Sequence, residues 1–276
     1  MSEDVSPSPE ASPNRFRVLV AYDGRPFEGW QSQVGGNTVQ DRILEALRVT
    51  CPEITTVQGS GRTDAGVSAS GQVAHFDAPA HWSMDATSWQ KALNARLPPE
   101  IRILKSESVS SEFHARFAAE RKTYRYRICV GEVLPPLLVG LAWHRRGLGE
   151  KERERLRSVL SLFEGEHDFR AFSARRKDGK DETRDTTRIL YEASIRENSN
   201  EQWDLIFEGN GFLYKMVRFL VGSAVYVISG KVSEDNLRLL LSEGKKSGEA
   251  PYCAPPDGLS LEQVSYPPPF DAAPPC

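Results

Sequence analysis

The segment GSGRTDAGVSASGQVAHFD, residues 59–77, combines a glycine-rich loop with an alternating apolar stretch. Asp64 lies between Arg62 and Gly66 in the loop. An aspartate followed two residues later by a glycine is common turn chemistry. The alternative is a carboxylate held on a tight loop for chemistry. The alternation that follows, in residues 71–78, predicts a strand directly after the loop.

Outward from this segment, the hydrophobic pattern predicts strands interrupted by helices in two successive halves. The predicted strands cover residues 15–24, 71–78 and 100–110, then 121–130, 186–198 and 202–210. The predicted helices cover residues 38–50, opening at Thr38, and 84–98, then 149–165 and 212–229. No glycine-rich phosphate loop stands at a strand-to-helix junction.

This order of elements predicts an α+β fold in which two ferredoxin-like halves join their sheets edge to edge, with a cleft between them. We expect the N-terminal half, with the Asp64 loop, to cover residues 15–120 and the C-terminal half residues 121–266. Residues 1–14 are rich in Ser, Pro and acidic residues, which favours a disordered tail, and residues 267–276 are expected to form a second loose end.

Composition limits the functional classes. The 276 residues carry a net charge of -3 and a pI near 6.0, so any nucleic-acid site must be a local basic patch. Cys51, Cys129, Cys253 and Cys276 show no spacing typical of zinc ligands or of a disulfide framework, which favours a reducing compartment. His75, His114 and His167 are likewise interpreted as packing or RNA-contact residues rather than metal ligands.

The N-terminal residues and the longest apolar stretch both favour a cytoplasmic location. The N-terminal residues lack the basic start and apolar middle of a signal peptide. The longest apolar stretch, residues 219–230, is too short to span a bilayer and follows Arg218 directly, so a buried helix is expected there and no membrane association.

Two segments combine aromatic with polar or basic side chains. In residues 21–33, Phe27, Trp30 and Gln31 either pack around a turn or face a base. In residues 112–127, basic residues alternate with aromatic ones, which suits phosphates and unpaired bases. Either face of the expected strand at 121–130 could serve RNA; a solvated edge strand with ordinary core aromatics is the alternative.

A third segment, residues 209–222, places Lys215 and Arg218 on an otherwise apolar helix. An arginine leading into a buried segment needs a partner, because an unpaired buried cation is costly. Asp64 would be a fitting partner. An arginine that extends to the surface is the other interpretation.

Taken together, the motifs resemble the bacterial tRNA pseudouridine synthase A family from about Phe16 to Tyr266. The motifs that carry the resemblance are AYDGRPFEGWQSQ, TVQDRILEAL, GRTDAGVSASGQVAHFD, LNARLP, FHARFAAERKTYRYRI, HDFRAF, GFLYKMVRFLVG and APPDGLSLEQVSY. The resemblance implies an eight-stranded, mainly antiparallel sheet with flanking helices and a central active-site cleft. It also implies isomerisation of uridine to pseudouridine at nucleotides 38, 39 and 40 of the tRNA anticodon arm, without cofactor or metal, by a homodimer.

The resemblance also implies roles for individual residues. Asp64 matches the catalytic aspartate, Tyr124 the active-site tyrosine and Arg218 the arginine that pairs with the aspartate. Leu259 matches a leucine near the target base and Arg62 an arginine that holds the flipped nucleotide. Arg116 and Lys215 are expected to contact the tRNA. Ser68 and Lys215 depart from the family, since many relatives carry a histidine at each position.

The chemistry suits these residue types. Moving the glycosidic bond from nitrogen to carbon requires a carboxylate that attacks the sugar or base, or acts as a base, and the sequence leaves these roles open. A non-catalytic RNA-binding relative and a synthase with other tRNA target sites are the alternatives. A carboxylate-based hydrolase would use a second acid, and GRTDAG offers none nearby.

Overall fold

The structure is a computed structural model that describes residues 14–174, 185–199, 201–243 and 249–271. The tail predicted at residues 1–14 therefore lies outside the described residues, apart from Asn14, with which the first strand begins.

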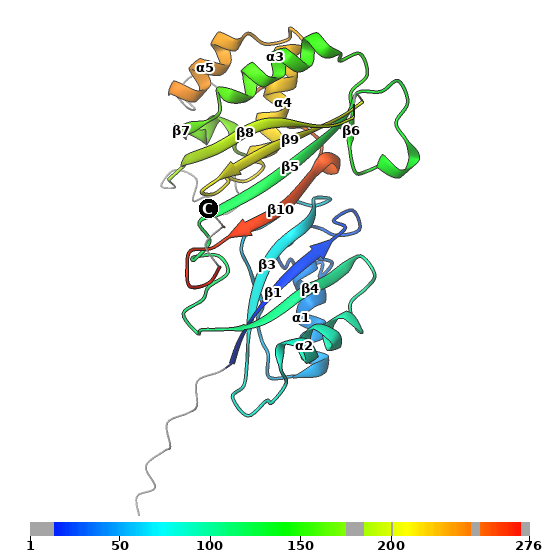
Figure 1. Cartoon of the computed structure of the whole chain (residues 1–276), viewed down its shortest axis with the longest axis vertical. Coiled ribbons are helices and arrows are strands. Elements are labelled where there is room, and N and C mark those ends of the chain that lie inside the picture. The colour runs from blue at the N-terminus through cyan, green and yellow to red at the C-terminus, as the bar shows by residue number, and fades with distance from the viewer. Residues whose placement is uncertain (1–13, 175–184, 200, 244–248, 272–276) are drawn as a thin grey trace, which may run out of the picture.

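One mainly antiparallel sheet runs through the whole molecule, as the sequence predicted (Figure 1). The strand order is β4-β1-β3-β10-β5-β9-β8-β7, with β2 paired to β3 and β6 paired to β5. The strands are β1 Asn14–Tyr22, β2 Gln58–Gly59, β3 Ser68–Ala78, β4 Ile101–Val109, β5 Arg121–Cys129, β6 Trp143–His144, β7 Gly165–Asp168, β8 Thr187–Ser199, β9 Gln202–Gly209 and β10 Leu259–Ser265.

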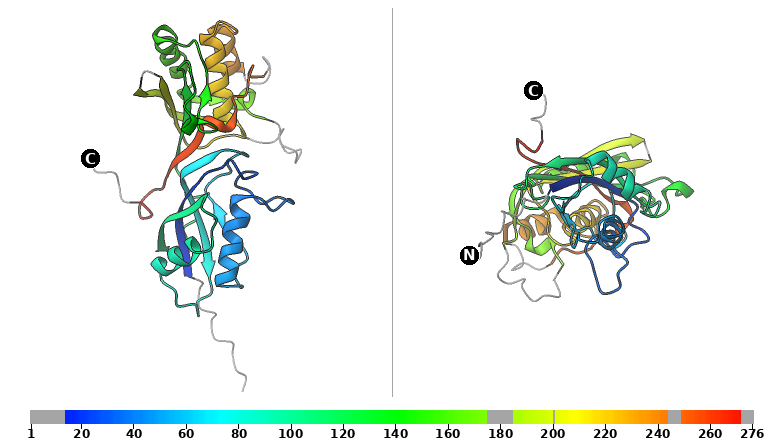
Figure 2. Two further views of the ribbon diagram at one scale, coloured as in Figure 1. Left: turned by 90° about the vertical axis from the view of Figure 1, so that its right-hand side faces the viewer. Right: turned by 90° about the horizontal axis from the view of Figure 1, so that it is seen from below.

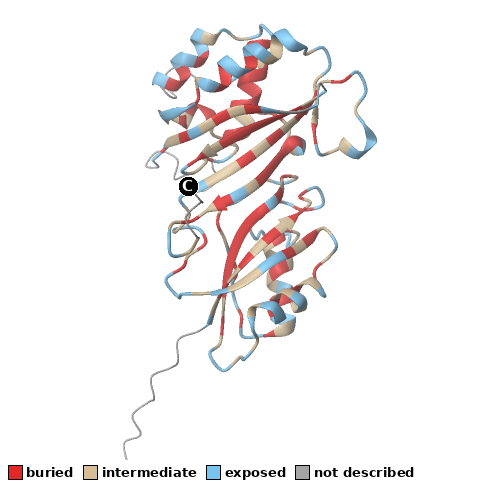
Figure 3. Ribbon diagram, in the orientation of Figure 1, coloured by how far each residue is buried: buried red, intermediate tan, exposed pale blue. Residues whose placement is uncertain are grey.

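In the described part of the chain, five α-helices pack on the two halves of the sheet. They are α1 Val39–Thr50, α2 Ala86–Asn94, α3 Glu150–Ser161, α4 Met216–Ile228 and α5 Glu234–Glu243. Figure 2 shows α1 and α4 on the same face of the sheet, one in each half. Buried residues gather along the middle strands and on α4 (Figure 3), so a continuous core connects the halves.

Two predicted helices show how local chemistry sets a boundary. The side chain of Thr38 accepts a hydrogen bond from the Asp41 amide, which caps α1 where the sequence predicted its start. The helix predicted over residues 212–229 instead begins at Met216. Lys215 precedes it with a φ of 61°, a left-handed conformation that a helix cannot include.

The strand β10 was not predicted, yet it joins the two halves. It pairs parallel to β3 through Ser260 and Leu261 and antiparallel to β5 along most of its length. Gly71 lies where β3 meets β10: a Cβ at this position would stand 1.9 Å from the carbonyl oxygen of Glu262. The junction between the halves therefore requires glycine at residue 71.

The expectation of a loose C-terminal end is wrong for residues 267–271. The ring of Phe270 packs edge-on against Phe113, with centroids 5.2 Å apart. Asp271 accepts a hydrogen bond from Arg17 at 2.6 Å and another from the amide of Tyr266. These contacts anchor the segment to β1 and to the end of β10. Residues 272–276, including Cys276, lie outside the described residues, whereas Cys51, Cys129 and Cys253 are free thiols.

We expect Gly71→Ala to lower the free energy of unfolding by more than about 3 kcal/mol, because the new methyl group would overlap the β10 backbone. Ser70→Ala, at the exposed neighbouring position, should change it by less than about 0.5 kcal/mol. Urea unfolding followed by circular dichroism measures both values, and equal stability of the two variants would contradict the role of Gly71.

His75 on β3 should make stability depend on pH. Burial, followed by the charges of Arg15 and His114, lowers its pKa to about 4 although Asp77 acts in the opposite direction. The unfolded chain therefore binds this proton at higher pH than the folded chain, and stability falls as the pH drops from about 6.5 toward 4. Of the stability lost between pH 7 and pH 5, we expect about 2 kcal/mol to come from His75, and His75→Gln should remove that part. Parallel stability profiles for the two proteins would contradict this assignment.

Candidate active site

The loop before β3 is a turn that also presents a carboxylate. The amide of Val67 donates to the carbonyl of Asp64 at 3.1 Å, and Gly66 adopts a φ of 79°. The hydroxyl groups of Tyr22 and Thr63 lie 2.8 Å apart, and the Trp30 amide donates to the Thr63 carbonyl. The predicted turn therefore forms, and it fixes the position of Asp64.

Hydrogen bonds from side chains of β3 and β5 hold the backbone of the Asp64 loop. The hydroxyl of Ser60 donates to Gln72 Oε1 at 2.7 Å, and Gln72 Nε2 donates to the Gly61 carbonyl at 3.0 Å. Lys122 Nζ donates to the Ser60 carbonyl at 2.7 Å. Burial, together with the charges of Arg116 and Arg188, lowers the pKa of Lys122 to about 8. The backbone that leads to Asp64 is thus tied to both β3 and β5.

Arg218 on α4 reaches Asp64 from the other half of the molecule. Its Nη1 donates to Asp64 Oδ2 at 3.0 Å, and both side chains are only 13% exposed. Its Nε donates to the Ala254 carbonyl at 2.7 Å. The prediction that Asp64 would be the partner of Arg218 agrees with this contact, and the arginine does not extend to the surface.

Residues 252–255, which precede β10, pack against α4 and hold Arg218 in position. A Cβ at Gly222 would stand 2.1 Å from the Tyr252 carbonyl oxygen, so glycine allows α4 to approach this segment closely. The Ala254 amide donates to the Arg218 carbonyl, and the Tyr126 hydroxyl donates to the Pro255 carbonyl at 2.8 Å. The Ala254 carbonyl, held in place by these contacts, therefore orients the guanidinium toward Asp64.

Tyr124 lies on β5 opposite Leu261 of β10 and Phe207 of β9. It is 7% exposed, and its ring contacts Phe212 edge-on with centroids 4.9 Å apart. Burial, and then the neighbouring Tyr22 and Asp64, raise the pKa of Tyr124 well above its ordinary value. A phenol in this environment stays protonated at neutral pH, so it can stack and share a hydrogen bond but does not act as a phenolate.

Leu259 begins β10, and Ser68 lies opposite the next residue of that strand. Leu259 is buried as the first residue of the strand, and the next residue, Ser260, pairs with Ser68 of β3. The Ser68 hydroxyl accepts a hydrogen bond from the Gly24 amide at 3.0 Å. The departure from the family at Ser68 is therefore accommodated by a backbone contact.

The remaining predicted site residues lie toward the surface. Arg62 is exposed and donates from Nε to Gln31 Oε1 at 3.0 Å. The exposed guanidinium of Arg116 lies 5.7 Å from the centre of the Phe117 ring, and Lys215 Nζ lies 5.1 Å from that of Tyr214. These three residues are chemically suited to an anionic partner without being part of the Asp64 contacts.

The structure decides between the interpretations of two segments. Phe27 and Trp30 are 7% and 1% exposed, so they pack in the core, as one of the two interpretations predicted, and do not face a base. The arginine face of β5 is also occupied, because Arg121 pairs with Glu208, Arg125 with Glu262, and Arg127 with Asp204. Carboxylates of neighbouring strands neutralise these charges, so this face is not a basic surface for RNA.

Sequence reasoning assigned Lys122 to a strand face but missed its contact with the Asp64 loop. The signal was its spacing, because Lys122 stands two residues before Tyr124 and therefore on the same face of β5. The Ala254 carbonyl was missed as well, since no side chain marks a backbone acceptor.

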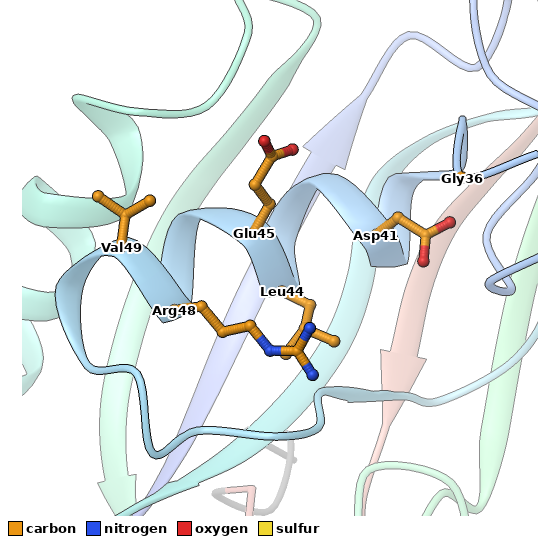
Figure 4. Close-up of a pocket in the computed structure, with 6 residues that line it drawn as sticks. All are labelled: Gly36, Asp41, Leu44, Glu45, Arg48 and Val49. Atoms are coloured by element: carbon orange, nitrogen blue, oxygen red, sulfur yellow. The ribbon is translucent and has the colours of Figure 1, made fainter.

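The surface also contains a hollow on the outer side of α1, lined by Gly36, Asp41, Leu44, Glu45, Arg48 and Val49 (Figure 4). Asp64, Tyr124 and Arg218 are not among these residues, so the hollow is separate from the candidate site. Within the described ranges, no cluster of three His, Cys, Asp or Glu side chains could hold a metal ion. No helix in the described part of the chain combines the length and apolar character needed to cross a membrane.

Comparison with known proteins defines the class. The family model described as "tRNA pseudouridine synthase" matches residues 18–118 and 159–267, which include Asp64, Arg218 and Leu259. The protein is therefore a pseudouridine synthase, an isomerase.

The relatives specify the family further. The chain is 44% identical to "tRNA pseudouridine synthase A" of Akkermansia muciniphila, over 92% of this chain and 95% of that protein. It is 39% identical to "tRNA pseudouridine synthase A 1" of Bacillus cereus, over 92% and 99% respectively. The chain belongs to the tRNA pseudouridine synthase A family. Among solved structures, one titled "Crystal Structure of a Cbf5-Nop10-Gar1 Complex" aligns with a TM-score of 0.39 and 14% identity over 89% of this chain and 48% of that chain.

The pair of Asp64 and Arg218 should be energetically coupled. We expect Arg218→Ala to lower the free energy of unfolding by about 3 kcal/mol, because it leaves a largely buried carboxylate without its partner. In the Asp64→Asn background the same substitution should cost at least about 1 kcal/mol less. Urea unfolding of the four proteins measures the difference, and equal costs in both backgrounds would show that the contact is not coupled.

Proposed function

We propose that this protein converts uridine to pseudouridine in the anticodon stem-loop of tRNA, at nucleotides 38, 39 and 40, with Asp64 as the catalytic residue and no cofactor. The observation that carries the proposal is the Asp64 carboxylate held by Arg218 at 3.0 Å, in a chain of this family. The choice of the anticodon arm comes from the family resemblance of the motifs.

The reaction rearranges one bond without a redox step. The bond from ribose C1′ to uracil N1 breaks, the base turns, and a bond from C1′ to C5 forms. C5 then loses a proton and N1 gains one, so atoms and electrons balance. In the proposal, the Asp64 carboxylate, which pairs with Arg218, acts on the sugar or base covalently or as a base.

Tyr124 and Leu259 would enclose the detached uracil. Tyr124 offers a protonated phenol beside Asp64, which suits stacking and hydrogen bonding to the loosened base. Leu259 supplies an apolar side chain near the site. Together they would keep the base from leaving before it reattaches.

Basic residues around the site would hold the tRNA. A uridine inside a stem must leave its stack at a cost of a few kcal/mol. Contacts from Arg62, Arg116 and Lys215 to phosphates would offset this cost. The expectations of a homodimer and of a cytoplasmic location remain proposals that follow from the family resemblance.

The test is pseudouridine mapping by carbodiimide treatment and primer extension on unmodified tRNA with anticodon-arm uridines. We expect wild-type protein to form pseudouridine at those positions without added nucleotide, and Asp64→Asn to lower the rate at least about 10⁴-fold, because the amide cannot replace the carboxylate. Asp235→Asn, at an exposed position on α5, is the matched control and should react at the wild-type rate.

Each other outcome has a defined meaning. Wild-type isomerisation by Asp64→Asn would exclude the proposed role of Asp64. Pseudouridine only outside the anticodon arm would indicate a synthase with other target sites. tRNA binding without any isomer would identify a non-catalytic RNA-binding relative.

A further inference from the structure

An exposed aromatic ring stands in the loop between β4 and β5. Phe117 is 77% exposed, although phenylalanine side chains are usually buried in monomeric proteins. The loop otherwise places its apolar residues inside, since Phe113 and Ala115 are fully buried. Core packing therefore does not explain the position of Phe117.

The turn holds this ring in a defined position. His114 Nδ1 accepts hydrogen bonds from the amides of Arg116 and Phe117 at 3.1 and 3.3 Å, and the Ala118 amide donates to the His114 carbonyl. Burial, and then the charge of Arg15, lower the pKa of His114, which favours the neutral ring whose Nδ1 accepts these hydrogen bonds. These hydrogen bonds order the backbone that carries the exposed Phe117 side chain.

A series of rings supports Phe117 from inside. The centroids of Phe117 and His114 lie 4.3 Å apart with an angle of 36° between the ring planes. The His114 ring in turn contacts the buried His75 ring at 4.6 Å. The Phe117 ring therefore rests against His114 while most of its surface stays available to a ligand.

Phe117 has a cationic neighbour, Arg116. Arg116 lies over the Phe117 ring at 5.7 Å. Arg116 is also near enough to Lys122 to lower its pKa, and Lys122 contacts Ser60 at the base of the loop that carries Asp64. Arg116, next to Phe117, is therefore linked electrostatically through Lys122 to the loop that carries Asp64.

An aromatic ring paired with a guanidinium favours RNA over a protein partner. Unpaired bases stack on aromatic side chains while arginines bind the adjoining phosphates. A protein-binding face is usually a contiguous apolar patch. The loop with exposed Val133, Leu137 and Val139 has that apolar character, whereas Phe117 stands between Arg116 and a small residue, Ala118.

We propose that Phe117 is a stacking platform for an unpaired base of the substrate RNA, with Arg116 binding the phosphate next to that base. The inference deepens the proposed function and rests on it for the identity of the RNA. It adds a base-binding subsite outside the contacts of Asp64, Tyr124 and Arg218. Phe117 acts there through substrate affinity and not through the reacting atoms.

The experiment measures the affinity for an unmodified tRNA anticodon stem-loop by fluorescence anisotropy at several salt concentrations. Phe117→Ala should raise the Kd about tenfold, because the stacking surface is lost, and Phe117→Trp should stay within about twofold of wild type. Leu137→Ala removes an equally exposed apolar side chain elsewhere and should leave the Kd unchanged.

Salt dependence separates the two parts of the subsite. Arg116→Ala should lower the slope of log Kd against log salt by about one, because one phosphate contact is lost. Phe117→Ala should leave that slope unchanged, since a base stack releases no counterion. Thermal unfolding of each variant confirms that the loop substitutions leave the fold intact.

Unchanged RNA affinity in Phe117→Ala would overturn the inference. A change of oligomeric state by light scattering, with unchanged RNA affinity, would also overturn it and assign Phe117 to a protein contact. If wild-type protein binds the stem-loop through Phe117 but forms no pseudouridine, the stacking platform stands and the proposed function fails.

Discussion

The ion pair between Asp64 and Arg218 joins positions 154 residues apart and brings the two halves of the chain to one point. Each partner is fixed by its own half. Thr63 and Ser60 hold the Asp64 loop against β1 and β3, while the Ala254 carbonyl and α4 hold Arg218. A largely buried ion pair requires good geometry to offset the loss of water. The relative position of the halves is therefore what the site depends on most.

Much of the fold could be predicted because local patterns agreed with it. The alternation in β1 and the amphipathic pattern of α1 both reflect burial on one side of an element. The strand β10 escaped prediction because its sequence, LSLEQVS, contains three polar residues in its second half. Its conformation is determined by pairing with β3 and β5, which are far away in the sequence, and such tertiary context overrides local propensity.

The candidate site was predictable where a single residue imposes a strong requirement. Arg218 before an apolar helix needs a buried anion, and this requirement led to Asp64. The arginines of β5 were misjudged because Asp204 and Glu262, which neutralise them, lie on other strands. Trp30 was ambiguous for a similar reason, since only the fold reveals that Gly59 leaves space for its ring. Pairing between distant segments is the information that a pattern of single residues lacks.

The place of β10 in the sheet has a consequence for how the protein is synthesised. It is the last strand along the chain, yet it lies between β3 and β5. Until residues 259–265 leave the ribosome, β3 and β5 each have an open edge. Ala254, whose carbonyl orients Arg218, is synthesised only shortly before these residues. The N-terminal half can form its own strands early, but the halves join only late in translation. During that interval the open edges are exposed to pairing with other chains.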